Sequence, residues 1–398
     1  MPLISSKQSV QPTALQIGAG NIGRALLGEI FSEAGFALTF ADVNEGLVTA
    51  LHNDKTYQIN IVSAAGSETK TIRDVDAISM LDEAALHEHI LHASIITTAV
   101  GVAVLPKIAP ALARGLAARL SHTTPTKHAT IIACENVAGN TTILRDHVLA
   151  QLPDDTTRRQ VLAAFSFPNC AVDRIVPNLA KSNSDSLTVT TEAYYLVAVD
   201  RTALHETPPP VAGFTYVDDI EAVLTQKLFT FNGSHAAAAY LGYREGCATI
   251  DQAVSHHDVT PQLAGFLEEV SAVLVSRYPS IALSDQQNFA QKTLTRIQNP
   301  YLHDTPARVG REPLRKLGQH DRLVQPALLA PEAGVKPTYI TRAIAAGFCF
   351  DSPTDPQAIE IQNGIRTEGA RATIARVTGL DENHWLVNDI ETAYRHLA

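Results

Sequence analysis

Strand-like and helix-like segments alternate along the first half of the chain. Short apolar runs are typical of buried strands, and the segments between them carry apolar residues at helical spacing. The predicted strands are 14–17, 37–42, 94–100 and 129–134, and the predicted helices between them are 21–34 and 104–120. This alternation predicts an α/β domain, a doubly wound sheet of parallel strands with helices on both faces.

Three further segments of the first half also predict strands. Residues 57–63 and 70–78 alternate apolar and polar positions, which predicts a hairpin inserted into the sheet. Residues 187–200 predict one more strand.

The second half of the chain has a mostly helical pattern. Apolar residues recur at helical spacing at positions 263, 266, 267, 270, 273 and 274. A later helix is expected to begin at Asp355-Pro356 and to end at Gly379, because proline favours the first turn of a helix and glycine its end. The second half is therefore predicted to form a mostly α-helical domain.

A run of three prolines at 208–210 marks the expected domain boundary, because proline cannot occupy a helix interior and stiffens a linker. The prediction is a flexible N-terminal extension at 1–13, an α/β domain with inserted strands at 14–206, and a helical substrate-binding domain at 207–398.

The composition limits the class of protein. The chain has 398 residues, of which 45% are hydrophobic and 18% charged, as expected for two globular domains. Its formal net charge of -10 argues against broad binding to nucleic acid or to an anionic membrane, so we expect small-molecule partners. Its four cysteines form no CxxC pair, and neither a signal peptide nor a membrane-spanning run is present. We expect a cytoplasmic protein that is a monomer or a small homo-oligomer.

A glycine-rich turn follows the first predicted strand. Gly18, Gly20 and Gly23 form a G-x-G-x-x-G pattern, and Asp42 ends the next strand about twenty residues later. Gly18 permits the tight turn, Gly20 lets the backbone approach a pyrophosphate, and Gly23 lets helix and strand pack closely. Asp42 is expected to bond to the adenosine ribose and to repel a 2′-phosphate, which favours NAD over NADP. The alternative is a glycine turn that merely packs.

The predicted NAD site extends beyond the glycines, to the segments that end the neighbouring strands. It comprises Ile17, Gly18, Ala19, Gly20, Asn21, Ile22, Gly23, Arg24, Asp42, Val43, Asn44, Thr98, Ala99 and Val100. Its setting between a strand and a helix predicts a Rossmann-type domain.

The segment from Lys227 to His235 brings an amine, an amide and an imidazole together. On an α-helix at about 100° per residue, His235 lies roughly 80° and Asn232 roughly 140° around from Lys227. Oxidation of an alcohol needs a base for the proton and donors for the oxyanion. A lysine whose pKa is lowered by burial beside Phe229 and Phe231 meets the first need without a metal, and an amide meets the second. For each residue alone, the alternative is a solvated lysine, a turn and a core histidine.

A basic segment lies at 304–317 in this otherwise acidic chain. Arginine suits bidentate contact with phosphate, so the cluster of Arg308, Arg311, Arg315 and Lys316 predicts a site for a dianion. The alternative is a solvated helical face whose cations pair with Glu312 and Asp304.

Two of these segments resemble motifs of the polyol-specific long-chain dehydrogenases, also called the mannitol dehydrogenase family. Lys227, Asn232 and His235 match the K-x4-N-x2-H motif, and residues 165–177 resemble the second signature. The pattern is echoed at 18–24, 40–44, 134–136 and 299–317, so the resemblance spans most of the chain.

The resemblance implies a role for each matching residue. Lys227 would be the general base, Asn232 and Asn169 the oxyanion hole, and His235 a substrate contact. Glu135 and Asn136 would lie near the nicotinamide, with Glu135 assisting proton exit. Asp173 and Arg174 belong to the second signature, and the alternative to a functional role for them is a structural ion pair that ties the two domains. One or two of the cations Arg308, Arg311 and Lys316 are expected to contact the substrate phosphate.

The expected activity is the NAD-dependent interconversion of mannitol 1-phosphate and fructose 6-phosphate, with a sugar or polyol phosphate as the small-molecule partner. Two alternatives stay open. One is a sibling activity, oxidation of free mannitol or reduction of a hexuronate. The other is a non-enzymatic regulator that senses NAD.

Overall fold

The computed structural model describes residues 11–63, 66–122, 128–177, 187–206 and 211–397. The chain divides into two compact units, Met1–Ile220 and Glu221–Ala398. Most of the predicted N-terminal extension, residues 1–10, and the proline-rich segment 207–210 lie outside the described residues.

The first unit is built on a six-stranded parallel sheet with the order β5-β2-β1-β6-β7-β8. From β1 the chain adds strands on one side, then crosses to β6 on the other side of β1 and continues outward. This reversal beside β1 is the doubly wound order of a Rossmann fold, so the predicted fold class is confirmed. The strands are β1 (Thr13–Ile17), β2 (Ala37–Asp42), β5 (Val75–Ser79), β6 (Ile95–Thr98), β7 (Ala129–Ala133) and β8 (Phe165–Ser166).

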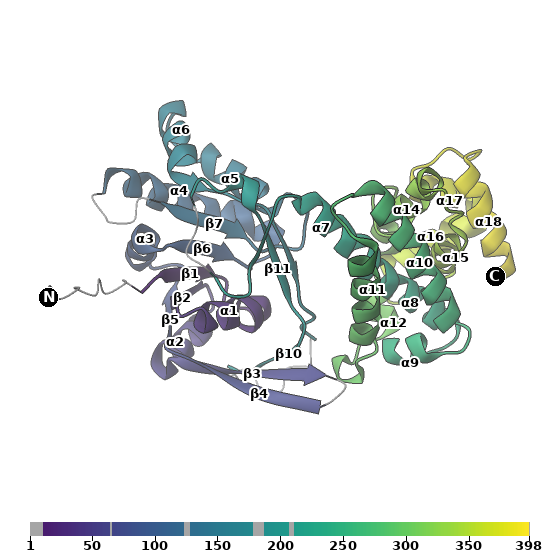
Figure 1. Ribbon diagram of the computed structural model, residues 1–398, viewed down its shortest axis with the longest axis horizontal. Coiled ribbons are helices and arrows are strands. Elements are labelled where there is room, and N and C mark those ends of the chain that lie inside the picture. Colours follow the sequence, from purple (N-terminus) through teal and green to yellow (C-terminus); the bar gives the residue numbers. More distant parts are fainter. Residues whose placement is uncertain (1–10, 64–65, 123–127, 178–186, 207–210, 398) are drawn as a thin grey trace, which may run out of the picture. The chain divides into compact units, whose positions relative to one another are not determined.

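Two hydrophobic cores cover the opposite faces of this sheet. Successive side chains of β1 alternate between them, with Ala14 in one core and Leu15 and Ile17 in the other. Helices α1 and α2 contribute to the first core, and α3, α4 and α5 to the second (Figure 1). The helices of this unit are α1 (Glu29–Glu33), α2 (Glu45–Asp54), α3 (Glu83–His92), α4 (Leu105–Ser121), α5 (Asn140–Ala150), α6 (Asp155–Ala164) and the short η2 (Val102–Val104) and η3 (Arg201–Ala203).

The helix after the glycine-rich turn begins as a π-helix, η1 (Gly23–Gly28), and continues as α1. The segment packs so closely that a Cβ on Gly28 would lie 2.1 Å from the Tyr57 hydroxyl oxygen and 2.9 Å from Phe40 Cζ. The Tyr57 hydroxyl donates a hydrogen bond to the carbonyl oxygen of Arg24 at 2.8 Å. A helix is therefore present where the sequence predicts one, but its first turns are wider than those of an α-helix.

The hairpin prediction is partly wrong. Strands β3 (Thr56–Ser63) and β4 (Gly66–Arg73) do pair as an antiparallel hairpin, but they form a separate sheet with β10 (Val189–Glu192). The predicted strand 70–78 is broken at Asp74, whose φ of 58° is left-handed, and the part after the break is β5 of the main sheet.

The predicted strand 187–200 is also divided. Its first part is β10, and its second part is β11 (Leu196–Asp200), which lies between β12 (Thr215–Val217) and β9 (Cys170–Asp173) in a third sheet. An alternating pattern predicts a strand but does not select its partner, because pairing depends on distant residues.

The second unit is helical. Asp355 caps α16 by accepting hydrogen bonds from the amides of Gln357 and Ala358, as its place before Pro356 predicts. The predicted helix that ends at Gly379 is two helices, because Gly369 has a φ of 88° and separates them. The helices are α7 (Ile220–Gln226), η4 (Lys227–Asn232), α8 (Gly233–Arg244), α9 (Ile250–Ser255), α10 (Thr260–Arg277), α11 (Leu283–Ile297), η5 (Pro300–Leu302), α12 (Pro306–Gly310), α13 (Pro313–Lys316), α14 (Val324–Leu329), η6 (Ala330–Ala333), α15 (Thr338–Phe348), α16 (Pro356–Glu368), α17 (Ala370–Thr378) and α18 (Trp385–Leu397).

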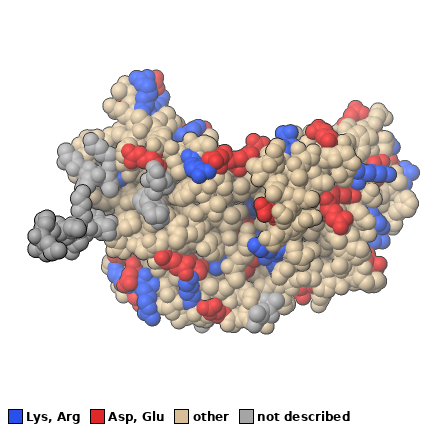
Figure 2. Space-filling model, in the orientation of Figure 1, with Lys and Arg blue, Asp and Glu red and all other residues tan. Residues whose placement is uncertain are grey.

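The surface carries mixed charge. On the face that Figure 2 shows, acidic and basic side chains are interspersed. Among the described residues, no helix has the length and apolar character needed to cross a membrane. The four cysteines are free thiols, with Cys134 and Cys170 buried and Cys247 and Cys349 half-buried.

Candidate active site and cofactor-binding loops

The three glycines of the turn after β1 differ in the space around them. A Cβ on Gly18, whose φ is 94°, would lie 2.5 Å from the carbonyl oxygen of Ala99, and a Cβ on Gly23 would lie 2.0 Å from that of Gly18. Gly20 is exposed, and a Cβ there would meet nothing within 4 Å. Gly18 and Gly23 are therefore required by packing, whereas Gly20 borders open space. This arrangement fits the approach of a pyrophosphate at Gly20.

A buried glutamine supports this turn from behind. Gln16 donates from Nε2 to the carbonyl oxygens of Ile17 at 2.8 Å and Gly18 at 3.0 Å, and its Oε1 accepts from the Thr97 hydroxyl at 2.5 Å. The sequence prediction did not include Gln16. A polar residue inside an otherwise apolar strand was the available signal.

Asp42 links the glycine-rich turn to the loop after β2. Its carboxylate accepts from the amide of Ala19 at 2.6 Å and from the amide of Asn44 at 2.9 Å. Each carboxylate oxygen has further acceptor capacity, so these contacts hold the side chain in place and leave room for hydroxyl donors. The geometry is compatible with the predicted contact to a ribose.

Arg24 is buried, and its guanidinium contacts the backbone. It donates to the carbonyl oxygens of Ala19 at 2.8 Å and Leu187 at 2.5 Å. Burial lowers the pKa of Arg24, although the side chains of Tyr57 and Asp42 oppose this effect. These contacts give Arg24 a role in holding the turn.

Glu135 follows β7 and accepts three hydrogen bonds from the end of β6 and the loop after it. The donors are the Thr98 hydroxyl at 2.9 Å and the backbone amides of Val100 at 3.0 Å and Gly101 at 2.9 Å. The carboxylate is buried and ties the two loops together. This contact set was not part of the sequence prediction, which gave Glu135 a role in proton exit.

Asn169 lies between β8 and β9, and its side chain contacts the first turn of α5. Its Oδ1 accepts from the backbone amides of Thr141 at 3.1 Å and Thr142 at 3.0 Å, which belong to the first turn of that helix. These bonds fix the amide plane, and Nδ2 lies 3.0 Å from the Thr142 hydroxyl. Nearby, Asn140 donates from Nδ2 to the carbonyl oxygens of Glu135 at 3.0 Å and Cys170 at 2.8 Å, a buried support that the sequence prediction missed.

The remaining residues predicted for the cofactor site divide by exposure. The exposed group is Asn21, Val43, Asn44 and Asn136, and the buried or half-buried group is Ile17, Ala19, Ile22, Ala99 and Val100.

The alternative role of Arg174, in an ion pair between domains, is corrected by the structure. The buried Arg174 guanidinium pairs with Glu29 of the same unit and donates to the backbone carbonyls of Ala25 and Glu192. The pair therefore joins η1 and α1 to the segment after β9 within the first unit.

Lys227, Asn232 and His235 lie on consecutive turns of one helix in the second unit. The assumption of α-helical spacing is wrong, because η4 is a π-helix over Lys227–Asn232 and becomes α-helical only at Gly233. A π-turn has an i→i+5 pattern, so the angle between Lys227 and Asn232 differs from the α-helical value. Lys227 is buried, as are Phe229 and Phe231 on the same turns.

His235 faces an acidic residue from the segment before α12. Its Nε2 lies 3.5 Å from Asp304 Oδ2, and its ring centroid lies 5.7 Å from that of Phe231. Arg308 also forms an ion pair with Asp304. Burial alone would raise the pKa of the Asp304 carboxyl, but His235 and Arg308 hold it below its ordinary value. The predicted histidine is thus placed beside a carboxylate.

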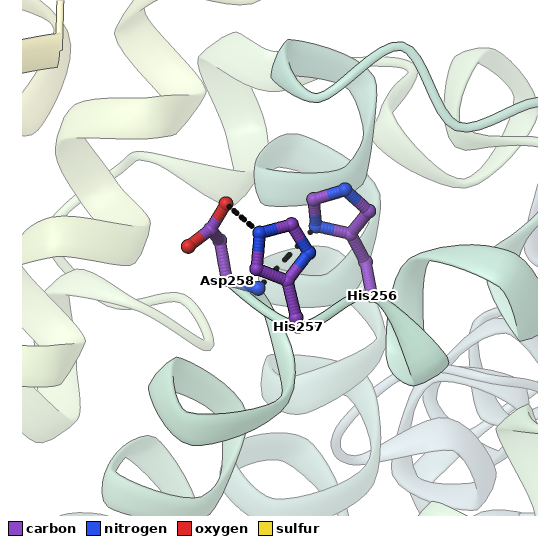
Figure 3. Close-up of side chains that lie close together, drawn as sticks. All are labelled: His256, His257 and Asp258. Carbon is purple, nitrogen blue, oxygen red and sulfur yellow. Dashed lines mark hydrogen bonds and ion pairs between the residues drawn. The ribbon is translucent and has the colours of Figure 1, made fainter.

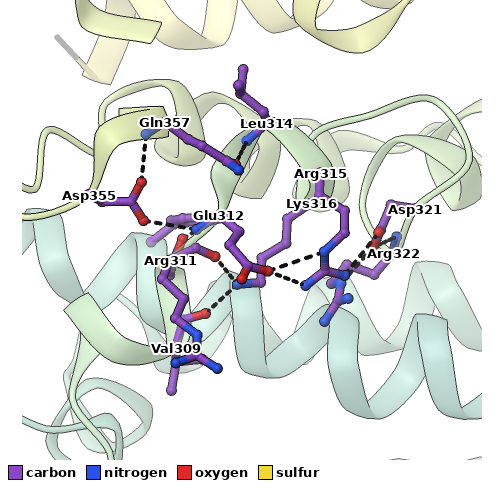
Figure 4. Close-up of polar contacts among 12 residues, drawn as sticks. Val309, Arg311, Glu312, Leu314, Arg315, Lys316, Asp321, Arg322, Asp355 and Gln357 are labelled. Carbon is purple, nitrogen blue, oxygen red and sulfur yellow. Dashed lines mark hydrogen bonds and ion pairs between the residues drawn. The ribbon is translucent and has the colours of Figure 1, made fainter. Parts of the chain in front are cut away.

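The basic segment is largely engaged within the protein (Figure 4). Arg315 pairs with Glu312 at 3.0 Å, and Arg308 pairs with Asp304, as in the alternative that the sequence left open. Lys316 is buried and donates from Nζ to the carbonyl oxygens of Val309, at 2.9 Å, and Arg311.

Two cations of this segment are in contrasting environments. Burial, together with the nearby Arg322 and Arg315, lowers the pKa of Lys316 to about 7. Arg311 is exposed, and its guanidinium has no hydrogen-bond or ion-pair partner among the described residues (Figure 4). Its backbone carbonyl is nevertheless held by Lys316, so an available guanidinium is attached to a fixed backbone.

One cluster of described residues has the donor set of a metal site. His256, His257 and Asp258, on the loop between α9 and α10, offer ligand atoms within 4.8 Å of one another (Figure 3). In this structure His257 Nε2 lies 3.1 Å from Asp258 Oδ2, and both side chains are exposed. None of the predicted catalytic residues belongs to this cluster.

The strand order, the glycine-rich turn and the acidic residue that ends β2 define an α/β protein with a Rossmann-type dinucleotide-binding fold. More specifically, the chain belongs to the mannitol dehydrogenase family of oxidoreductases. The model of the mannitol dehydrogenase Rossmann domain matches residues 12–213, and that of the mannitol dehydrogenase C-terminal domain matches residues 219–398.

The chain is also similar to individual proteins. A mannitol-1-phosphate 5-dehydrogenase from Brevibacillus brevis is 38% identical over 388 residues, which cover 96% of this chain and 98% of the relative. The ternary complex of Pseudomonas fluorescens mannitol 2-dehydrogenase with NAD and D-mannitol has a TM-score of 0.71 at 17% identity, covering 97% of this chain and 92% of that one. A substrate-free D-sorbitol dehydrogenase has a TM-score of 0.80 at 16% identity, covering 97% and 93%. The two solved structures share the fold of this chain.

Proposed function

We propose that this protein interconverts mannitol 1-phosphate and fructose 6-phosphate with NAD as the hydride carrier. The observation that carries the proposal is the 38% identity, across 96% of the chain, to a mannitol-1-phosphate 5-dehydrogenase. The half-buried Asp42 and the open space at Gly20 support NAD as the cofactor.

The proposed cofactor site is formed by the first unit. Gly18, Gly20 and Gly23 would bring backbone amides to the pyrophosphate, and Asp42 would accept hydrogen bonds from the adenosine ribose. Glu135 would keep the loop at Val100 in position beside the nicotinamide. NAD supplies a carbon that accepts hydride in one direction and, when reduced, returns it in the other.

The proton chemistry is assigned to Lys227. In the oxidative direction its neutral amine takes the proton of the reacting hydroxyl, and in reduction its ammonium returns that proton to the alkoxide. Asn232 and Asn169 donate N–H groups to the reacting oxygen in both directions. The bonds that Asn169 accepts from the first turn of α5 would hold its amide in a fixed plane for this task.

His235 is assigned a substrate contact. Its proximity to Asp304 would hold the imidazole in one orientation, as a carboxylate commonly does for a functional histidine.

Arg311 is the strongest candidate for the substrate phosphate. Its guanidinium has no partner among the described residues, whereas Arg308 pairs with Asp304 and Lys316 donates to backbone carbonyls. Arg308 and Lys316 would then act mainly by supporting this segment. A planar guanidinium on a fixed backbone suits bidentate contact with a dianion.

The test is NADH oxidation by the purified full chain with fructose 6-phosphate, fructose or a hexuronate. The variants are Lys227→Ala and, as a matched control, Lys292→Ala, which changes an exposed lysine of α11. The proposal expects turnover with fructose 6-phosphate, loss of that turnover in Lys227→Ala, and unchanged turnover in Lys292→Ala.

The other outcomes separate the alternatives. Preferred turnover of fructose or of the hexuronate would keep the reaction type but reject the phosphate substrate and the role of Arg311. Tight NADH binding without turnover of any of these compounds would favour a regulator. Full activity of Lys227→Ala would reject the lysine base.

A further inference from the structure

A fully buried glutamine of α11 contacts both sides of the segment that carries Lys227. Gln286 donates from Nε2 to the hydroxyl oxygens of Thr230 at 2.9 Å and Ser271 at 3.2 Å. Its Oε1 accepts a hydrogen bond from Nε2 of Gln226 at 2.9 Å. Gln226 directly precedes Lys227, and Thr230 lies three residues after it, so one side-chain amide bonds on both sides of the lysine.

The neighbouring bonds determine which way this amide faces. The Ser271 hydroxyl donates its proton to the carbonyl oxygen of Leu267 at 2.6 Å, so it can only accept from Gln286. The amide nitrogen of Gln286 must therefore face Ser271 and Thr230, and its oxygen must face Gln226. Both N–H groups and the oxygen are then bonded, and a buried polar group satisfied in this way is a rigid element.

The bonds act on an unusual piece of backbone. Thr230 belongs to the π-helix η4, which starts at Lys227, and π-turns are rare and often found at functional sites. Ser234, also fully buried, donates from its hydroxyl to the carbonyl oxygen of Thr230 at 2.6 Å. The wide turn is thus held on its side-chain face by Gln286 and on its carbonyl face by Ser234.

We propose that Gln286 is a positioning residue for the reaction, because it fixes the π-turn from which the Lys227 side chain projects. The inference rests on the proposed function, in which Lys227 is the base. Gln286 acts through Lys227 and does not touch the substrate. A shift of the lysine therefore slows the chemical step without weakening substrate binding in proportion.

Gln286→Met tests this inference, because methionine is similar in length and forms none of the three bonds. The expected result is a decrease in kcat on the order of 10- to 100-fold, which is the effect of a shift of about 1 Å in a catalytic group. The KM for fructose 6-phosphate and the Kd for NADH should stay close to those of the unchanged protein. A residue that only stabilised the fold would lower the unfolding midpoint and leave kcat per folded molecule unchanged.

Two further variants serve as control and as partner. Gln287→Met makes the same replacement one position along α11, at an exposed residue, and should leave kcat unchanged. Thr230→Val keeps the shape of the partner but removes its hydroxyl, and should lower kcat in the same way. Because both changes remove the same bond, the double variant should lose less than the product of the two single effects.

The inference is overturned if folded Gln286→Met keeps the kcat of the unchanged protein, or if it raises KM while kcat is maintained. If Gln286→Met does not fold, Thr230→Val decides, and its unchanged kcat would reject the inference. If the inference about Gln286 is rejected in this way, loss of activity in Lys227→Ala would still support Lys227 as the base. Retained activity in Lys227→Ala would instead reject the lysine base itself.

Discussion

The close contact between η1 and Tyr57 leads to a quantitative prediction for Gly28→Ala. The new Cβ would lie 2.1 Å from the Tyr57 hydroxyl oxygen and 2.9 Å from Phe40 Cζ. Overpacking of a core costs about 1–3 kcal/mol, and displacement of Tyr57 loses its bond to Arg24, about 0.5–1.5 kcal/mol. Alanine gains about 1 kcal/mol over glycine inside a helix, which offsets part of this cost. The expected net change is a loss of about 2 kcal/mol in the free energy of unfolding.

The partner variant Tyr57→Phe identifies the cause of that loss. Without the hydroxyl, the nearest obstacle is absent and the hydrogen bond is already lost, so Gly28→Ala should cost less than about 1 kcal/mol in this background. Gly46→Ala is the matched control, because Gly46 is an exposed glycine of α2 whose Cβ would meet Asn44 Oδ1 at an ordinary 3.5 Å. It should be neutral or stabilising by up to about 1 kcal/mol.

Urea unfolding of the four proteins of this cycle, followed by circular dichroism, measures the coupling between positions 28 and 57. The expected coupling is at least about 1 kcal/mol, since the two changes act on one contact. An equal loss from Gly28→Ala in both backgrounds would refute the reasoning, because the hydroxyl oxygen would then not be the obstacle. Stabilisation by Gly28→Ala in the unchanged protein would refute the close packing altogether.

Two further predictions concern buried charged groups. In Glu135→Gln one acceptor oxygen becomes an NH2 group, which faces the amide of either Val100 or Gly101, so that hydrogen bond is lost. NADH affinity in a fluorescence titration should therefore fall by about tenfold or more. Glu68→Gln, at an exposed residue of β4, should leave it unchanged. Burial lowers the pKa of Lys316 to about 7, so above this pH the lysine is mostly neutral in the folded protein but still protonated in the unfolded chain. Folding is therefore favoured as the pH rises towards the ordinary pKa of lysine. The free energy of unfolding should therefore increase by about 2 kcal/mol between pH 7 and 9 relative to Lys316→Met, and parallel pH profiles for the two proteins would contradict the buried lysine.

The central sheet could be predicted because its signals are local. β6 and β7 are short, fully buried strands of mostly β-branched residues, and the turn needs a glycine at position 18 for its φ of 94° and one at position 23 because of the nearby Gly18 carbonyl. The pairing of the outer strands is not local. β3 and β10 are far apart in sequence, and nothing in an alternating pattern indicates that they pair in a sheet of their own.

The candidate site shows a similar division. The types and spacing of Lys227, Asn232 and His235 are visible in the sequence, because the motif is contiguous. Their support is not, since Gln286 lies 56 residues from Thr230 and acts through the fold. A polar residue within an apolar strand was the signal available for Gln16, whereas Gln286 lies among polar residues and had no such signal. The sequence could not say which distant groups they bond.

The two π-helices show why helical periodicity misjudged the geometry at both candidate sites. η1 follows the glycine-rich turn and η4 carries Lys227, and the apolar pattern of each is compatible with an α-helix. In each, a buried hydroxyl bonds a carbonyl of the wide turn, from Tyr57 to Arg24 and from Ser234 to Thr230. A π-turn costs regular i→i+4 bonds, so its stability depends on such added donors and on close packing. The geometry of the helix after the glycine-rich turn and of the helix that carries Lys227 therefore depends on side chains other than the motif residues themselves.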